Sequence, residues 1–179
     1  NKLNTFYDFI DVTKGLLDKG YGKKDRVYAG GGRAGGLLMG AIVNMAPNLY
    51  KGIISNVPFV DVITTMSDPS IPLTTGEYSE WGNPDIKEEF EYIMQYSPYD
   101  NISEQEYPSI LVTAGLWDSQ VQYYEPAKYV AKLRDYNKGK NPILMKVNMT
   151  AGHSGVSGRF ESLKELAMEY AFLLRLDSN

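Results

Sequence analysis

Two kinds of hydrophobic pattern alternate along the chain. Five segments place apolar residues three or four positions apart, as on one face of a helix: 4–19, 34–45, 84–96, 124–136 and 157–176. Four short apolar runs between them are typical of buried strands: 26–29, 52–57, 109–115 and 143–149. Helices that alternate with buried strands predict an α/β fold with about four mostly parallel strands and flanking helices.

One long segment lacks either pattern. Residues 61–80 are rich in Pro, Thr, Ser and Gly and show no sustained period. Such a stretch is long for a structureless connection, so we expect it to carry function or to pack against another part of the protein. The chain shows no internal repeat, low-complexity tract or linker, which favours a single unit over residues 1–179.

Composition narrows the possible chemistry. With 18 Lys and Arg against 22 Asp and Glu, the net charge is −4 at pH 7, and no run of basic residues appears, so we expect no nucleic-acid partner. It has no Cys and one His, which excludes thiolate and multi-histidine metal sites, so we expect no metal and no cofactor. No apolar stretch approaches the roughly 20 residues of a membrane span, and residues 1–8 do not resemble a signal peptide, so we expect no membrane partner and a cytoplasmic location.

A glycine cluster joins the first predicted strand to the second predicted helix. Glycine-rich turns between a strand and a helix occur in several kinds of functional site. Gly30, Gly32 and Gly35 satisfy the dinucleotide-binding pattern G-x-G-x-x-G in the right context. Dinucleotide binding also needs an acidic residue at the end of the following strand, yet the first acid there is Asp61, beyond the strand's end at Val57. A phosphate-binding P-loop is excluded because no Gly-Lys-Ser/Thr follows the glycines.

The same cluster fits the nucleophile elbow of hydrolases, G-x-S-x-G. Here the frame is Gly31-Gly32-Arg33-Ala34-Gly35, with small residues where strand and helix must approach and Arg33 in the central position. Arginine stays protonated and has no lone pair to attack a carbonyl carbon, so it cannot replace the serine nucleophile. A third interpretation is a turn in which the glycines serve close packing alone.

Two further residues stand where a hydrolase of this type needs them. The chain order in such enzymes is nucleophile, acid and histidine, with the acid after a later strand and the histidine after the last one. Asp118 follows the predicted strand 109–115, and His153 follows the predicted strand 143–149. Their joint occurrence favours the elbow interpretation of Arg33 over the packing interpretation.

Longer motifs extend along nearly the whole chain. They are VPFVDV at 57–62, PLTTGEY at 72–78, EWGNP at 80–84, SPYDN at 97–101, DSQVQY at 118–123, AGH at 151–153 and SGRF at 157–160. With these motifs the sequence resembles the prolyl oligopeptidase family of serine peptidases, in particular the C-terminal part of the catalytic domain in its oligopeptidase B branch. The resemblance implies an α/β-hydrolase fold, of which residues 1–179 form the C-terminal portion. The family's propeller and first hydrolase strands would precede Asn1.

The resemblance assigns roles around the elbow. It makes position 33, occupied by Arg33, the place of the serine nucleophile, Asp118 the acid of the triad and His153 the general base. The Ala34 N–H becomes one oxyanion donor. With Arg33 in the nucleophile's place, the chain as written is expected not to cleave peptides by this route. The alternative function is a non-catalytic module that binds peptides or assembles with a partner.

The resemblance also implies a substrate class, short peptides cleaved after Arg or Lys. The acids that bind the basic side chain in the family lie in the segment that matches residues 76–81, which makes Glu77 and Glu80 the substrate-binding candidates. Ser79 stands where the family often has a second acid, which weakens the implied preference for basic residues. We expect the Arg33 guanidinium to imitate such a substrate and to pair with Glu77. Because the first predicted strand lacks the neighbour that it has in the family, we expect a segment of another chain or self-association to cover its open edge.

Overall fold

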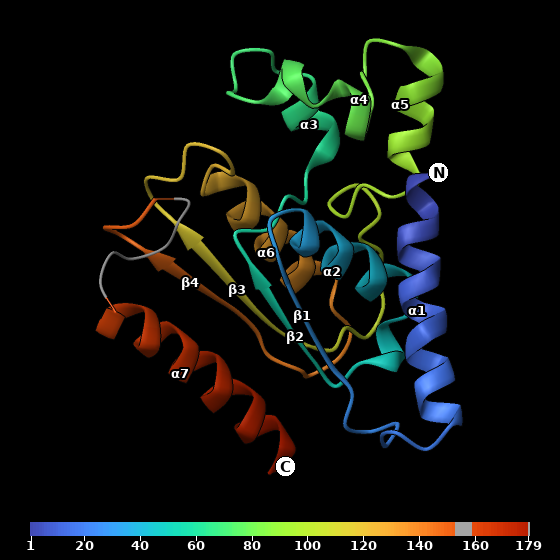
Figure 1. Ribbon diagram of the computed structural model, residues 1–179, viewed down its shortest axis with the longest axis vertical. Coiled ribbons are helices and arrows are strands. Elements are labelled where there is room, and N and C mark those ends of the chain that lie inside the picture. The colour runs from blue at the N-terminus through green and yellow to red at the C-terminus, as the bar shows by residue number, and fades with distance from the viewer. Residues whose placement is uncertain (153–158, 179) are drawn as a thin grey trace.

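The computed structural model describes residues 1–152 and 159–178 (Figure 1). The strands are β1 (Tyr28–Gly32), β2 (Gly52–Asn56), β3 (Ser109–Gly115) and β4 (Ile143–Asn148). The helices are α1 (Lys2–Asp18), α2 (Ala34–Met45), α3 (Val62–Met66), α4 (Tyr78–Trp81), α5 (Lys87–Met94), α6 (Tyr124–Tyr136) and α7 (Arg159–Asp177). Short 3₁₀ helices cover Pro47–Leu49 and Thr74–Gly76. None of the described helices is both long and apolar enough to cross a membrane.

The four strands form one parallel sheet in the order β1-β2-β3-β4, so neighbours in the chain are neighbours in the sheet. This arrangement confirms the predicted parallel sheet. Gly32 at the end of β1 lies beside Asn56 at the end of β2, and Asn56 lies beside Thr113 of β3. Because parallel strands end at the same edge of a sheet, the turns that follow them meet at that edge.

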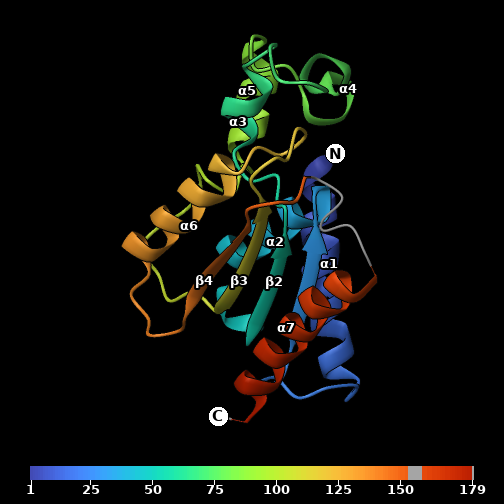
Figure 2. The same ribbon diagram turned by 90° about the vertical axis from the view of Figure 1, so that its left-hand side faces the viewer.

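Helices cover both faces of the sheet (Figure 2). Ile53 and Ile110 belong to the main core on the face of α2 and α6, with α1 packed against α2. Their neighbours Ile54 and Leu111 pack on the opposite face against Phe172 of α7. Since the inner strands are buried on both faces, they form continuous apolar runs in the sequence and not alternating ones.

The segment 57–96 leaves the sheet after β2 and carries α3, α4 and α5 beyond the carboxyl ends of the strands (Figure 1). Trp81, Ile93 and Tyr96 are buried at its centre and belong to one core cluster with Phe59 and with Phe6 of α1. The aperiodic stretch 61–80 packs into the same cluster through Val62 and Met66. Its two α-helices have five and four residues, too few to show a helical period in the sequence.

Several predicted boundaries differ from the structure. The first strand is Tyr28–Gly32 and not 26–29, so the glycines themselves form its end. They pair with β2, with Gly30 beside Ile54, and this pairing outweighs the low strand propensity of glycine. The helix expected at 84–96 covers only Lys87–Met94, and the helix expected from residue 4 begins at Lys2.

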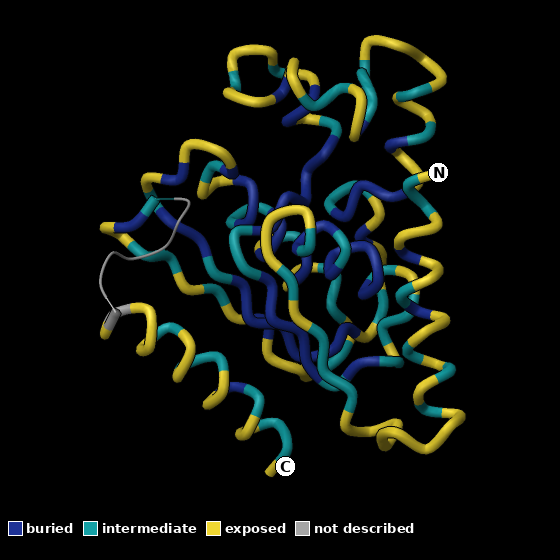
Figure 3. Tube along the Cα trace, viewed as in Figure 1, coloured by how far each residue is buried: buried dark blue, intermediate teal, exposed yellow. Residues whose placement is uncertain are grey.

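Burial differs between the inner and outer strands (Figure 3). Nearly every residue of β2 and β3 is buried, whereas β1 contains partly and fully exposed residues. Within the described residues β1 pairs with β2 alone. Its other edge is open, and an open strand edge is a template for a further strand.

Candidate active site

Arg33 is the single residue between β1 and α2. Its backbone angles, φ 57° and ψ −119°, lie where residues other than glycine rarely occur. Its carbonyl accepts hydrogen bonds from the N–H groups of Leu37 and Phe59, both at 3.2 Å, while its side chain is exposed. A sharp strand-to-helix turn with an exposed central residue is the geometry of a nucleophile elbow, as the sequence predicted.

Small residues make this turn possible. A Cβ atom on Gly31 would lie 2.4 Å from the carbonyl oxygen of Gly35, and a Cβ atom on Gly36 would lie 2.5 Å from the Cα atom of Pro58. Both distances are far shorter than van der Waals contact. Glycine at these positions therefore lets the start of α2 approach both the end of β1 and the turn that follows β2.

Replacing Gly31 by Ala is expected to lower the free energy of unfolding by about 1–3 kcal/mol, because the added methyl group collides with the backbone of Gly35. Gly35→Ala is the matched control, since a Cβ atom there meets nothing within 4 Å and a helix favours Ala over Gly by about 1 kcal/mol. Denaturant unfolding of both variants measures the difference. Equal stability of the two would contradict the tight approach at Gly31.

The predicted triad acid lies in a turn that orients its carboxylate. Asp118 follows β3, and only 5% of its surface is exposed. Its Oδ1 accepts hydrogen bonds from the N–H groups of Gln120 at 2.8 Å and Val121 at 2.9 Å. Because backbone donors hold this oxygen, the direction of the carboxylate is set by the loop itself.

The loop after β4 lies against the loop of Asp118. The Trp117 N–H donates a hydrogen bond to the carbonyl oxygen of Ala151 at 3.2 Å. A Cβ atom on Gly115 would lie 2.6 Å from the same oxygen, so only glycine fits there. The structure thus brings the predicted acid close to the segment that precedes the predicted general base. His153 itself lies outside the described residues.

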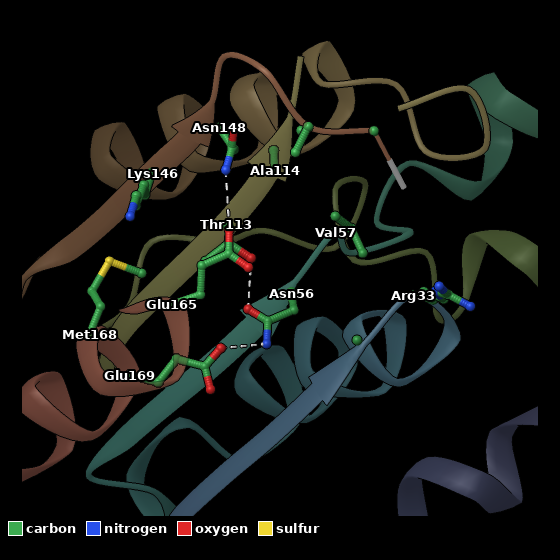
Figure 4. Close-up of a pocket in the computed structure, with 14 residues that line it drawn as sticks. Arg33, Asn56, Val57, Thr113, Ala114, Lys146, Asn148, Glu165, Met168 and Glu169 are labelled. Atoms are coloured by element: carbon green, nitrogen blue, oxygen red, sulfur yellow. Dashed lines mark hydrogen bonds between the residues drawn. The ribbon is translucent and has the colours of Figure 1, made fainter. Parts of the chain in front are cut away.

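A cavity of about 430 Å³ opens at the carboxyl ends of the strands, beside α7 (Figure 4). Arg33 and Gly152 both line it, so the elbow and the loop after β4 face one space. In its wall the Thr113 hydroxyl donates to Asn56 at 2.7 Å, and the Asn56 amide donates to Glu169 at 2.8 Å. The Arg33 side chain points away from these groups. Among the described residues, no three acidic or histidine side chains are arranged to hold a metal ion.

A second cavity, of about 180 Å³, shares Arg33 with the first. Its polar lining residues are Arg33, Thr65, Thr74, Glu77, Glu80 and Gln120, and Ala34 lies beside them. Apolar side chains complete the wall: Phe59, Met66, Leu73, Trp81 and Val121 are among them. This cavity brings together the elbow, the oxyanion candidate, the loop that follows the predicted acid and both predicted substrate-binding acids.

The two predicted substrate-binding acids differ in their surroundings. Glu77 Oε2 accepts a hydrogen bond from Trp81 Nε1 at 2.9 Å, which orients the carboxylate. Glu80 Oε1 lies 3.4 Å from Lys2 Nζ, and the Glu80 side chain is 54% exposed, so solvent screens this pair. Within the part of the chain that the structure describes, Arg33 forms no ion pair, and the expected pairing of Arg33 with Glu77 is wrong. The elbow leaves the guanidinium in water, where an ion pair would gain little.

Trp81 is a residue whose role the sequence analysis missed. Its ring lines the second cavity, its Nε1–H holds Glu77, and Lys2 Nζ lies 4.0 Å from its ring centre. The signal that could have found it is the spacing of four residues from Glu77, because such residues are neighbours on one helix face. The short helix α4 provides that face.

Comparison with known proteins identifies the family to which the elbow and the surrounding loops belong. The model of the prolyl oligopeptidase family matches residues 1–178. Over 174 residues the chain is 63% identical to dipeptidyl aminopeptidase BI of Pseudoxanthomonas mexicana and 53% identical to protease 2 of Moraxella lacunata. Each match covers 97% of this chain, and 24% and 25% of those proteins. The chain therefore spans about a quarter of the length of these curated relatives.

Solved structures agree with this match. Oligopeptidase B from Leishmania major superposes with a TM-score of 0.95 at 47% identity, over 97% of this chain and 24% of that one. Oligopeptidase B from Trypanosoma brucei, with covalently bound antipain, has a TM-score of 0.95 at 46% identity, over 97% of this chain and 25% of that one. The four parallel strands are thus the C-terminal portion of an α/β-hydrolase fold, as the resemblance implied. Because the family model matches almost every residue and the turn at Arg33 has the elbow geometry, the chain belongs to the prolyl oligopeptidase family of serine peptidases.

Proposed function

We propose that this chain is the C-terminal part of the catalytic domain of a serine-type oligopeptidase that hydrolyses short peptides after Arg or Lys. Arg33 makes the chain inactive as written. The observation that carries the proposal is the shared lining of the 180 Å³ cavity by the elbow residue, by Ala34, by Glu77 and by the loop that follows Asp118. The position of the nucleophile, one oxyanion donor and a group for substrate recognition thus face one space.

With a serine at position 33, its hydroxyl oxygen would attack the scissile carbonyl carbon. His153 would accept the hydroxyl proton and later return it to the leaving amine, while Asp118 orients the imidazole and stabilises its charged form. The Ala34 N–H lies in the first turn of α2, where backbone donors lack partners within the helix, and would donate to the oxyanion. Asp118 suits its role because two backbone N–H groups already hold its Oδ1.

Neutralising Glu77 is expected to weaken the preference for basic substrates. In the full-length protein with Arg33→Ser, Glu77→Gln is expected to raise KM for an arginine-linked chromogenic peptide by about 10- to 100-fold, since a hydrogen bond to a charged group contributes about 1.5–3 kcal/mol. KM for a leucine-linked peptide is expected to stay unchanged. Glutamine still accepts the Trp81 hydrogen bond, so the cavity keeps its shape.

Glu91→Gln is the matched control for this measurement, because Glu91 lies on α5, is 61% exposed and pairs only with Lys87 at 3.7 Å among the ion pairs of the described residues. Its removal is expected to leave both KM values as they are. An unchanged ratio of the arginine and leucine KM values in Glu77→Gln would contradict the assignment of Glu77 and leave Glu80 as the acid to test.

A second candidate function is the release of dipeptides from the amino termini of peptides. It is favoured by the 63% identity to dipeptidyl aminopeptidase BI. Two chromogenic substrates that differ only in a free or a blocked amino terminus separate the alternatives in the Arg33→Ser protein. Cleavage of the free form alone supports dipeptide release, whereas cleavage of both forms supports the oligopeptidase.

The open edge of β1 is proposed to pair with a strand outside residues 1–179. Within the described residues β1 has β2 as its single neighbour and stays partly exposed. Since the chain spans about a quarter of its curated relatives, the remainder of a longer protein can supply that strand, and self-association through β1 is the alternative. The cytoplasmic location stays a prediction from the sequence.

A further inference from the structure

Glu125, in the first turn of α6, is a buried acid that the mechanism above does not use. Only 1% of its surface is exposed. Its Oε1 accepts hydrogen bonds from the N–H groups of Val60 at 2.6 Å and Asp61 at 2.8 Å. Its Oε2 accepts a hydrogen bond from the Thr65 hydroxyl at 2.9 Å. One carboxylate therefore ties α6 to three donors in the segment that leads from β2 through α3.

These hydrogen bonds join two walls of the 180 Å³ cavity. Phe59 and Met66 form one wall, and they belong to the segment that Glu125 binds. Val121 forms part of another wall, and its N–H also donates to Asp118. Three residues after Val121 the chain enters α6, the helix of Glu125. Movement of α6 relative to the segment 57–66 would thus change the cavity and break the Glu125 contacts together.

Charged groups surround Glu125 from both elements. Asp61 is 1% exposed, accepts a hydrogen bond from the Thr64 N–H at 3.3 Å and forms an ion pair with Lys128 of α6. Lys128 Nζ also lies 4.9 Å from the ring centre of Tyr99. Burial raises the pKa of Glu125 to about 7; the three donated hydrogen bonds oppose this rise, and the Asp61 charge adds to it.

The raised pKa has a defined consequence for stability. Between pH 4.5, the ordinary pKa of this group, and about 7, folded Glu125 keeps a proton that the unfolded chain releases. The contribution of Glu125 to stability is therefore complete below pH 4.5 and is lost as the pH rises through about 7. Glutamine cannot titrate, so Glu125→Gln removes this slope.

We propose that Glu125 is a positioning residue for substrate binding, which fixes the cavity wall of Phe59 and Met66 against the loop of Asp118. The inference rests on the proposed function, because this cavity is the one assigned to the basic side chain of the substrate. Among the residues that the structure describes, Glu125 contacts none of those proposed for catalysis, and it affects substrate binding by fixing the position of Phe59 and Met66. Its loss therefore weakens binding of the substrate more than it slows the chemical step.

The kinetic test uses the full-length protein with Arg33→Ser. Glu125→Leu is expected to raise KM for an arginine-linked peptide about tenfold, with less than about a threefold change in kcat. Glu125→Gln is expected to restore KM to within about twofold, because its oxygen accepts both backbone N–H groups and its amide can donate to Thr65. Glu91→Leu, at an exposed acid of α5, is the matched control and is expected to change neither parameter.

Hydrogen exchange of residues 57–66 supplies a readout that does not depend on catalysis. Glu125→Leu is expected to lose about tenfold in protection there, and Glu125→Gln to lose none. Because leucine can prevent folding, Thr65→Val is a milder variant with a smaller expected change in the same direction. It removes the hydrogen bond to Oε2, and exchange is its deciding readout because Thr65 also lines the cavity.

The outcomes separate the two proposals. Unchanged KM and unchanged exchange in Glu125→Leu, or in Thr65→Val where the leucine variant does not fold, would overturn the positioning role. A large fall in kcat with constant KM would overturn it as well. Absence of turnover in the Arg33→Ser protein, with exchange altered as expected in Glu125→Leu, would contradict the proposed function instead.

Discussion

Replacing Arg33 by Ser is expected to raise turnover of an arginine-linked chromogenic peptide by about 10⁶-fold in the full-length protein, the scale of loss when a serine hydrolase is deprived of its nucleophile. The physical reason is that the backbone already has the elbow conformation, φ 57° and ψ −119°, and that glycines leave room for it. On the proposed function, we therefore expect a single side chain to account for the loss of activity. Release of the chromophore over time measures the gain.

Arg33→Ala is the matched control, because it removes the guanidinium without supplying a nucleophile. It is expected to bind the peptide and to cleave none. A cation at the positive end of the α2 dipole destabilises the folded protein by about 0.3–1 kcal/mol. Both substitutions remove this cation, so neither variant is expected to lose stability. Peptide binding without turnover in both variants would contradict the peptidase and support the non-catalytic binding module.

Replacing Asp118 by Asn in the Arg33→Ser background is expected to lower kcat by about 10⁴-fold, as the same change does in another serine peptidase. Oδ1 of Asp118 is committed to two backbone N–H groups at 2.8 and 2.9 Å. Asparagine can keep that acceptor, and its amide nitrogen then takes the place of Oδ2. A hydrogen-bond donor at that position favours the wrong tautomer of the histidine. The substitution also removes the negative charge that stabilises the protonated histidine.

Asp68→Asn is the matched control for Asp118, since Asp68 also accepts a hydrogen bond from the N–H two residues ahead, at 2.9 Å from Ser70. It is expected to change kcat by less than about twofold, within the range of surface substitutions. The pH profile of kcat/KM is measured for both variants beside Arg33→Ser. A loss of less than about tenfold in Asp118→Asn would remove Asp118 from the triad.

Much of the fold could be predicted from the sequence. Local hydrophobic patterns place β3 at Ser109–Gly115, α2 at Ala34–Met45 and α6 at Tyr124–Tyr136, and the structure confirms these bounds. The end of β1 could not be predicted, because glycine has a low strand propensity and its place in the sheet depends on pairing with β2. The short helices in 61–80 could not be predicted either, because tertiary packing around Trp81 stabilises them.

Part of the candidate site could also be predicted from the sequence, and part could not. The elbow at Arg33 and the position of Asp118 after β3 follow from order and spacing along the chain, and the structure confirms both placements. The predicted ion pair between Arg33 and Glu77 is wrong. Opposite charges in the sequence do not indicate the direction in which the elbow places the Arg33 side chain. The roles of Trp81 and Glu125 were missed because their partners depend on how the segment 57–96 packs against α6.

The amino-acid sequence was sufficient to predict the fold class, the family and the chemistry that Arg33 precludes, because these depend on residue identity and on spacing within one segment. Three-dimensional packing was needed to see that Arg33, Glu77 and the loop of Asp118 line one cavity, and that hydrogen bonds of Glu125 connect its walls. Those contacts join residues that lie tens of positions apart. Their free energy comes from burial and from hydrogen bonds that form only when the whole chain packs, and no local pattern records them.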